Sequence, residues 1–351
     1  MAETLRVGIS IGDINGIGME VIIKTFLDNR MMEICTPIVY GSSKVTAFHL
    51  KALDIQDFSF NVIKKAQDFN SKRANLINLW DEDIDMKLGE STAMGGEYAF
   101  KSLKTAVEDL ASGKTDVLIT APINKKNIQS DDFKFAGHTE FLADYANEEN
   151  PLMILCDGGL RVGLVTGHLP LKDVSAALSK EGIIAKLEVF DKTLRQDFGI
   201  EKPKIAVLGL NPHSGDNGLL GTEEQEIISP AIKHAFNKGI LAMGPYPADG
   251  LFGSSTYQKF DGILAMYHDQ GLAPFKAMAF HNGVNYTAGL PIVRTSPDHG
   301  VGYDIAGQNK ASEQSFRQAV YLACDIYKTR RMNKQLLANS LDNPKAAPEE
   351  V

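Results

Sequence analysis

The sequence predicts an α/β protein in which helices cover the faces of largely parallel sheets. Short apolar runs typical of buried strands alternate along the chain with longer amphipathic segments typical of helices. The 351 residues exceed what one typical core needs, so the length favours two domains. A chain of this size buries enough surface to fold without disulfides, and its three cysteines form no Cys-x-x-Cys pair.

The first half begins with a predicted strand at residues 5–11, which the loop Gly12–Gly18 connects to a helix at residues 20–27. Residues 91–110 are predicted to form an amphipathic helix, because apolar residues recur at helical spacing at Ala99, Leu103, Ala106, Val107 and Leu110. The polar stretch at residues 51–85 shows little pattern. Further strands are predicted at residues 36–40, 76–79 and 116–120.

In the second half, two apolar runs flank Asp157-Gly158-Gly159 and predict paired strands around a turn, at residues 152–156 and 162–166. Thr222 and Gln225 have the spacing of a capping box at the start of a helix. Further strands are predicted at residues 204–210, from residue 263 onward and at residues 284–290. Further helices are predicted from residue 141, at residues 178–198 and at residues 311–331.

The composition limits the partners of the protein. A formal net charge of −8 and a pI of about 5.5 argue against binding a nucleic acid through a broad basic surface. The N-terminal residues MAETLRVGIS lack the apolar core of a signal peptide, and no apolar run is long enough to cross a bilayer. We therefore expect a cytoplasmic protein without a nucleic-acid or membrane partner.

Three apolar runs end at or just before a histidine, namely His168, His213 and His268. Because the carboxyl ends of parallel strands lie along one edge of a sheet, these three imidazoles could converge. A single histidine is more often a hydrogen-bonded structural residue, but its repetition at equivalent positions favours a metal site. Neutral imidazoles suit zinc or cobalt, and three ligands leave coordination positions open for a substrate.

Polar residues near these strand ends suggest how a substrate would be held. Lys276, Asn285 and Arg294, with His138 and Thr139 upstream, form a set suited to an anion, although a solvated lysine and arginine would look the same in sequence. The nearby carboxylates are Asp249 and Asp269. Either could orient a histidine that binds metal, or could simply cap a turn.

Two glycine-rich loops were compared with nucleotide-binding motifs. The loop Gly12–Gly18 has the spacing Gly-x-x-x-Gly-x-Gly, and no acidic residue follows the next strand, so we interpret it as a tight turn and not as a cofactor site. A better nicotinamide candidate is residues 299–307, in which the candidate contacts are His299, Gly300, Asp304 and Gly307.

Long motifs in a fixed order resemble the 4-hydroxythreonine-4-phosphate dehydrogenase family of pyridoxal phosphate biosynthesis. They are GDINGIGME, TAPINK, GHTEF, VTGH, NPHSGDNGLLGTEE, YHDQGL, VNYTAGLPIVRTSPDHG and DIAG, and they cover nearly the whole chain. The segment HGVGYDIAG is also similar to the cofactor loop of isocitrate and isopropylmalate dehydrogenases. That likeness implies a two-domain α/β/α fold, with residues 1–136 plus 305–345 in one domain and residues 137–304 in the other.

The resemblance implies roles for particular residues. One divalent ion, zinc, magnesium or cobalt, would be held by His168, His213 and His268, and the substrate would be contacted by His138, Thr139, Lys276, Asn285 and Arg294. The family is dimeric with shared active sites, so a homodimer is expected in which His268 is lent across the interface. Ile14, Asn15 and Met19 depart from the proline, alanine and proline that are usual in the first loop.

The implied reaction is oxidation of 4-phosphooxy-L-threonine at C3 by NAD or NADP, followed by decarboxylation to 3-amino-2-oxopropyl phosphate. Asp249, Asp269 or a metal-bound water would be the base, and Lys276 would protonate the enol carbon. A dehydrogenase for phosphorylated threonate or erythronate is the nearest alternative. A metal-dependent phosphohydrolase and a non-catalytic binding protein are the alternatives from other classes.

Overall fold

Twelve strands form one continuous sheet in the computed structural model, which describes residues 4–279 and 281–338. Across the sheet the order is β3-β4-β2-β1-β5-β12-β11-β6-β7-β10-β8-β9. Neighbouring strands are parallel except where β6 pairs with β7 and β11, and where β11 pairs with β12. The strands are β1 (Leu5–Ser10), β2 (Cys35–Gly41), β3 (Asn61–Ile63), β4 (Asn75–Asn78), β5 (Val117–Thr120), β6 (Leu152–Asp157), β7 (Leu160–Leu164), β8 (Lys204–Leu208), β9 (Leu241–Tyr246), β10 (Gly262–Ala265), β11 (Val284–Ala288) and β12 (Arg294–Pro297).

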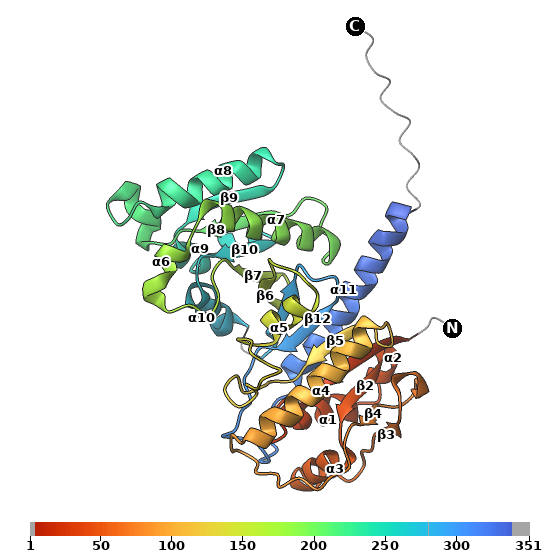
Figure 1. The fold of residues 1–351 in the computed structure, drawn as a ribbon. Coiled ribbons are helices and arrows are strands. Elements are labelled where there is room, and N and C mark those ends of the chain that lie inside the picture. The colour runs from red at the N-terminus through yellow and green to blue at the C-terminus, as the bar shows by residue number, and fades with distance from the viewer. Residues whose placement is uncertain (1–3, 280, 339–351) are drawn as a thin grey trace.

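Helices cover both faces of this sheet (Figure 1). The α-helices are α1 (Gly18–Leu27), α2 (Met31–Ile34), α3 (Ser43–Ala52), α4 (Ala93–Ala111), α5 (His138–Tyr145), α6 (Val174–Ala177), α7 (Lys180–Gln196), α8 (Ser229–Asn237), α9 (Ala248–Phe252), α10 (His268–Met278) and α11 (Gln314–Ala338). Shorter helical turns are η1 (Ala66–Asp68), η2 (Leu171–Asp173), η3 (Pro212–Gly218), η4 (Glu224–Ile228) and η5 (Ser255–Lys259).

Successive side chains of a strand point to opposite faces of the sheet, so the apolar residues of one strand pack against helices on both faces. In β5, Val117 and Ile119 join the cluster that contains α1 and α11, whereas Leu118 joins the cluster under α4. Toward the other end of the sheet, Val207 joins the same cluster as α7, and Ala206 packs with α9 and α10. The predicted α/β class, with helices on both faces of a largely parallel sheet, is therefore confirmed.

Most predicted elements lie within a few residues of the observed ones, but some were missed. The polar cluster after the run from Ile263 is the first turn of α10, and the glycine-rich region before residue 307 contains β12. The elements α3, β3 and β9 also had no sequence prediction. The capping box is not formed, because among the described residues no hydrogen bond joins the side chain of Thr222 to the backbone N–H of Gln225, and the turn at η4 has no side-chain cap.

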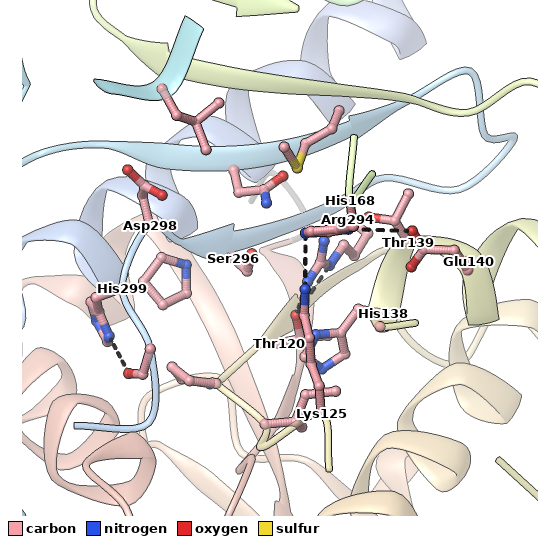
Figure 2. Close-up of a pocket in the computed structure, with 18 of the residues that line it drawn as sticks. Thr120, Lys125, His138, Thr139, Glu140, His168, Arg294, Ser296, Asp298 and His299 are labelled. Carbon is pink, nitrogen blue, oxygen red and sulfur yellow. Dashed lines mark hydrogen bonds and ion pairs between the residues drawn. The ribbon is translucent and has the colours of Figure 1, made fainter. Parts of the chain in front are cut away.

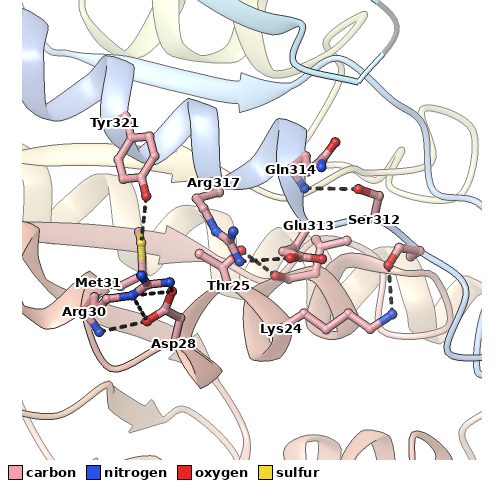
Figure 3. Close-up of polar contacts among 12 residues, drawn as sticks. Lys24, Thr25, Asp28, Arg30, Met31, Ser312, Glu313, Gln314, Arg317 and Tyr321 are labelled. Atoms are coloured by element: carbon pink, nitrogen blue, oxygen red, sulfur yellow. Dashed lines mark hydrogen bonds and ion pairs between the residues drawn. The ribbon is translucent and has the colours of Figure 1, made fainter.

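The C-terminal helix α11 and the segment before it are bonded to the first two helices, α1 and α2 (Figure 3). Lys24 donates from Nζ to Glu20 Oε1 and to the carbonyl of Ala311, at 2.8 Å each, and Tyr321 donates from its hydroxyl to Met31 Sδ at 3.4 Å. These contacts bring segments from the two ends of the sequence together. The single sheet runs through both predicted domains, whose boundaries stay a prediction, and residues 339–345 of that assignment lie outside the described part of the chain.

None of the described helices combines the length and the apolar character needed to cross a membrane.

Candidate active site

A cavity of about 280 Å³ lies near the centre of the sheet, where β5, β11 and β12 meet the starts of α5 and α10 (Figure 2). Its lining draws on segments that are far apart in sequence. The polar and charged residues that line it are Thr120, Lys125, His138, Thr139, Glu140, His168, His268, Lys276, Asn285, Arg294, Ser296, Asp298 and His299.

Arg294 is the deepest charge in this cavity. Its side chain is 2% exposed and donates to the hydroxyls of Thr120, at 2.6 and 3.1 Å, and of Thr287, at 3.0 Å. No carboxylate of the described residues forms an ion pair with it. Burial lowers the pKa of Arg294 to about 9. Glu140, in the same cavity, partly opposes this shift but forms no ion pair with Arg294. A buried cation without a bonded carboxylate is costly to maintain, so its place in a cavity favours an anionic ligand.

Besides Nε2 of His299, two further polar atoms in the cavity have no partner among the described residues. They are Nε2 of His138, at the start of α5, and Oδ1 of Asn285, on β11. Burial, together with the nearby charges of Arg294 and Lys125, holds the pKa of His138 well below its usual range, so this imidazole is neutral. Buried polar atoms are almost always hydrogen-bonded, so these atoms suit direct contact with a polar ligand.

His168 and His268 face each other in the same cavity, with ring centroids 5.6 Å apart. His268 donates from Nδ1 to Asp269 at 2.7 Å, which leaves its Nε2 with a free lone pair. His168 accepts a hydrogen bond at Nε2 from Lys125 at 2.9 Å, while its Nδ1 lies 3.9 Å from Glu140. In both rings Nε2 therefore carries the lone pair, and this is the tautomer in which Nε2 can bind a metal.

His213 does not join this pair. Five consecutive residues, 213–217, have left-handed backbone conformations, and the resulting turn leaves His213 exposed outside the cavity. Within residues 4–279 and 281–338, no cluster of three metal-binding side chains is assembled. The prediction that three imidazoles converge is therefore correct for only two of them in a single chain. His268 lines the same cavity as His168 of its own chain, so these two imidazoles meet within one subunit, and the sharing of ligands between subunits stays a prediction.

The two carboxylates proposed as bases lie elsewhere. Asp249 is exposed on α9 and does not line the cavity, and Asp269 is exposed and bound to His268. Asp298, which the sequence analysis overlooked, lines the cavity instead and forms an ion pair with Lys276 at 3.0 Å. Burial raises the pKa of Asp298, and Lys276 partly opposes this shift.

The predicted nicotinamide contacts divide into two groups. His299 and Gly300 line the cavity, whereas Asp304 and Gly307 lie beyond it, Asp304 being exposed. His299 accepts no hydrogen bond at its buried Nε2, and burial lowers its pKa. Of the four predicted cofactor contacts, His299 and Gly300 are therefore the two that can meet a ligand in this cavity.

Sequence reasoning also overlooked Thr120, Lys125, Glu140 and Ser296. Thr120 and Lys125 follow the same strand-end rule that picked out the histidines, because they belong to the end of β5 and the loop after it. Glu140 stands directly beside the predicted His138 and Thr139. Applying the strand-end rule to every polar residue would have found Thr120 and Lys125, and only its place beside His138 and Thr139 points to Glu140. Ser296 lies within β12, which the sequence did not predict.

The fold and the cavity define an α/β protein with a small polar cavity that holds a buried arginine and two facing imidazoles. A family model described as pyridoxal phosphate biosynthetic protein PdxA matches residues 33–323, and the chain belongs to that family. The family membership expected from the motifs is thereby confirmed.

Individual relatives agree with this assignment. The 4-hydroxythreonine-4-phosphate dehydrogenase of Bacteroides thetaiotaomicron is 52% identical, over 96% of this chain and 93% of that protein. A proposed D-threonate 4-phosphate dehydrogenase of Oceanobacillus iheyensis is 39% identical, over 94% of this chain and 100% of that protein. The crystal structure of the 4-hydroxythreonine-4-phosphate dehydrogenase of Klebsiella pneumoniae superposes with a TM-score of 0.80 at 33% identity, covering 93% of this chain and 98% of that chain.

Proposed function

We propose that this protein is a nicotinamide-dependent 4-hydroxythreonine-4-phosphate dehydrogenase. It oxidises 4-phosphooxy-L-threonine at C3, and the product loses carbon dioxide to give 3-amino-2-oxopropyl phosphate. The observation that carries the proposal is the buried Arg294, which has no ion-pair partner among the described residues, in one cavity with the facing imidazoles of His168 and His268. The 52% identical relative named for this activity supports the same substrate.

The anionic groups of the substrate would meet the cations and neutral donors around Arg294. His138, Thr139, Asn285 and Lys276 surround that residue, and charge-assisted hydrogen bonds of this kind are worth about 1.5 to 3 kcal/mol each. His299 and Gly300, on the edge of the same cavity, are the proposed approach of NAD or NADP. A cavity of about 280 Å³ is small, which fits a compact substrate with the cofactor reaching it from outside.

His168 and His268 fit a divalent ion because each offers Nε2 while a carboxylate lies on its Nδ1 side. When bound, such an ion makes an alcohol easier to deprotonate and stabilises negative charge on its oxygen. Asp269 holds His268 in the required tautomer, which is a positioning role and not that of a base. Lys125, now on Nε2 of His168, would have to move aside.

A second copy of the chain would supply the third imidazole, His213. Large apolar side chains are exposed on the segments that carry the separated histidines, with Leu169 and Leu171 close to His168 and Leu219 and Leu220 close to His213. Exposed apolar residues gathered near a binding site are typical of a surface that another subunit covers. This supports the homodimer with shared sites.

Lys276 and Asp298 form the acid–base pair of the cavity. Replacing Asp298 with asparagine should lower kcat by about 100-fold, because general acid–base groups typically contribute 10² to 10⁴. A carboxylate accepts a proton only when ionised, so activity of the wild type should fall as the pH drops through the raised pKa of Asp298, which Lys276, His299 and His268 face. In the pH profile of kcat, the acid limb should shift or disappear in Asp298→Asn. An unchanged acid limb would assign it to another group.

A D-threonate 4-phosphate dehydrogenase is the second candidate, because a relative given that name matches 94% of this chain at 39% identity. The two substrates differ at C2, where one carries an ammonium and the other a hydroxyl. The purified protein with zinc, magnesium or cobalt should be assayed with each substrate and with NAD or NADP. We expect NADH formation with 4-phosphooxy-L-threonine at a higher kcat/KM than with D-threonate 4-phosphate.

The same assay contains its own counter-tests. A higher kcat/KM for D-threonate 4-phosphate would select the second candidate. Release of inorganic phosphate without NADH would reject both dehydrogenases in favour of a phosphohydrolase. Cytoplasmic location and the lack of a nucleic-acid partner stay predictions from the composition.

A further inference from the structure

The loop Gly12–Gly18 touches both walls of the cavity without lining it. One wall is the loop after β5, with Pro122, Ile123 and Lys125, and the other is the loop after β12, with Asp298, His299 and Gly300. We propose that Asp13 in this loop is a positioning residue that fixes the two walls relative to each other. The proposal rests on the dehydrogenase function for its catalytic consequence and on the geometry of the loop for everything else.

The backbone of this loop is bonded to each wall. Asp13 donates from its N–H to the carbonyl of Pro122 at 3.0 Å, and Ile17 donates to the carbonyl of Val301 at 2.9 Å. The glycines permit this approach. A Cβ on Gly12, whose φ is +67°, would lie 2.2 Å from the carbonyl oxygen of Pro122, and one on Gly16 would lie 2.7 Å from that of Val301. The glycine spacing that did not fit a nucleotide fingerprint therefore serves two backbone contacts.

The side chain of Asp13 joins the same two walls a second time. It is 1% exposed, and its Oδ2 accepts hydrogen bonds from the hydroxyl of Tyr303 at 2.7 Å and from Nδ2 of Asn127 at 2.8 Å. Its Oδ1 accepts from the backbone N–H of Asn15 at 2.9 Å. The hydroxyl of Tyr303 also accepts from Nδ2 of Asn124 at 3.2 Å. Asn124 and Asn127 belong to the wall of Lys125, and Tyr303 belongs to the wall of His299.

The buried negative charge of Asp13 makes this junction sensitive to the loss of any hydrogen-bond donor. No lysine, arginine or histidine among the described residues forms an ion pair with Asp13. A buried carboxylate without a cation is tolerated only when neutral donors satisfy its oxygens, so loss of one donor should loosen the whole junction.

The two walls contact residues that are proposed to take part in the reaction, so their relative position should affect the rate. Lys125, on one wall, reaches Nε2 of His168, and Asp298, on the other wall, forms an ion pair with Lys276, so each wall contacts a residue proposed to take part in the reaction. A displacement of about 1 Å in such groups can cost roughly 100-fold in rate. The competing interpretation is that this network merely adds stability, like any other buried hydrogen-bonded pair.

Two tyrosine variants distinguish a positioning role of the network from a role in stability alone. Tyr303→Phe removes the hydroxyl that Asp13 binds. Tyr40→Phe removes a hydroxyl that also donates to a carboxylate, that of Asp109 at 2.9 Å, in the interior of the same half of the sheet and away from the cavity, where Lys114 is an additional partner of Asp109. We expect Tyr303→Phe to lower kcat roughly tenfold or more, with a fall in Tm no larger than that of Tyr40→Phe. Asp13→Asn should show a similar loss, and the double variant Asp13→Asn/Tyr303→Phe should lose little more than either single variant.

Backbone hydrogen–deuterium exchange gives a readout that needs no catalysis. In Tyr303→Phe, exchange should rise in residues 121–127 and 298–305 together, whereas Tyr40→Phe should leave both segments unchanged. Equal kinetic effects in the two tyrosine variants, or exchange that rises only around residue 303, would overturn the positioning role. If the wild type is inactive with every substrate, the dehydrogenase function is rejected. If the two walls still loosen together in Tyr303→Phe, the structural role of the junction stands all the same.

Discussion

Replacing Arg294 with methionine should remove substrate binding while leaving the ligand-free protein as stable as the wild type, or more stable. The guanidinium is buried without an ion-pair partner among the described residues, and burial lowers its pKa to about 9 although the charge of Glu140 partly opposes this shift. Removing such a charge relieves a desolvation cost, and buried ionic groups replaced by apolar side chains of similar volume are often neutral or stabilising. Loss of its contacts to the substrate, at about 1.5 to 3 kcal/mol each, should raise KM by roughly 10- to 100-fold or more.

The matched control is the same substitution at Arg330. That side chain is also largely buried, but it donates from Nη2 to Asp197 at 3.0 Å and forms an ion pair with it. Arg330→Met leaves the 4% exposed Asp197 without its cation, which should cost about 3 to 5 kcal/mol of unfolding free energy. Denaturant unfolding and steady-state kinetics of both variants provide the test. An Arg294→Met protein destabilised as much as Arg330→Met would mean that Arg294 supports the fold.

Mixing inactive His168→Ala and His213→Ala proteins should restore activity once subunits exchange. If His168 and His268 belong to one subunit and His213 to the other, each mixed dimer has one intact site. With random exchange of equal amounts, half of the dimers are mixed and half of their sites are intact, so about a quarter of the wild-type activity should return. Metal content should rise in parallel, since each rebuilt site regains three imidazoles.

A second mixture serves as the control for the first. His168→Ala mixed with His268→Ala should stay inactive, because both histidines line the same cavity of one chain and every mixed site lacks one of them. Mass spectrometry of intact dimers establishes that exchange has occurred. Recovery in the second mixture and none in the first would instead place His268 across the interface. A stable monomer would exclude the shared site.

The sequence by itself determined the α/β class, most strands and the residues that surround the cavity. These are local properties, because apolar periodicity reports burial and a polar residue after a buried strand must lie at the edge of a parallel sheet. His168, His268 and Arg294 were found in this way, His138 was named as their upstream companion, and all four line one cavity.

Only the tertiary structure decided which of these groups meet. The left-handed turn at residues 213–217 takes His213 away from the other two histidines, and that turn is fixed by contacts of Glu224 with the backbone N–H groups of Leu210 and Asn211. The pairing of Lys276 with Asp298 and the junction at Asp13 likewise depend on segments far apart in sequence. Strand ends are a local property, but the direction in which a loop leaves them depends on long-range packing, which no periodicity records.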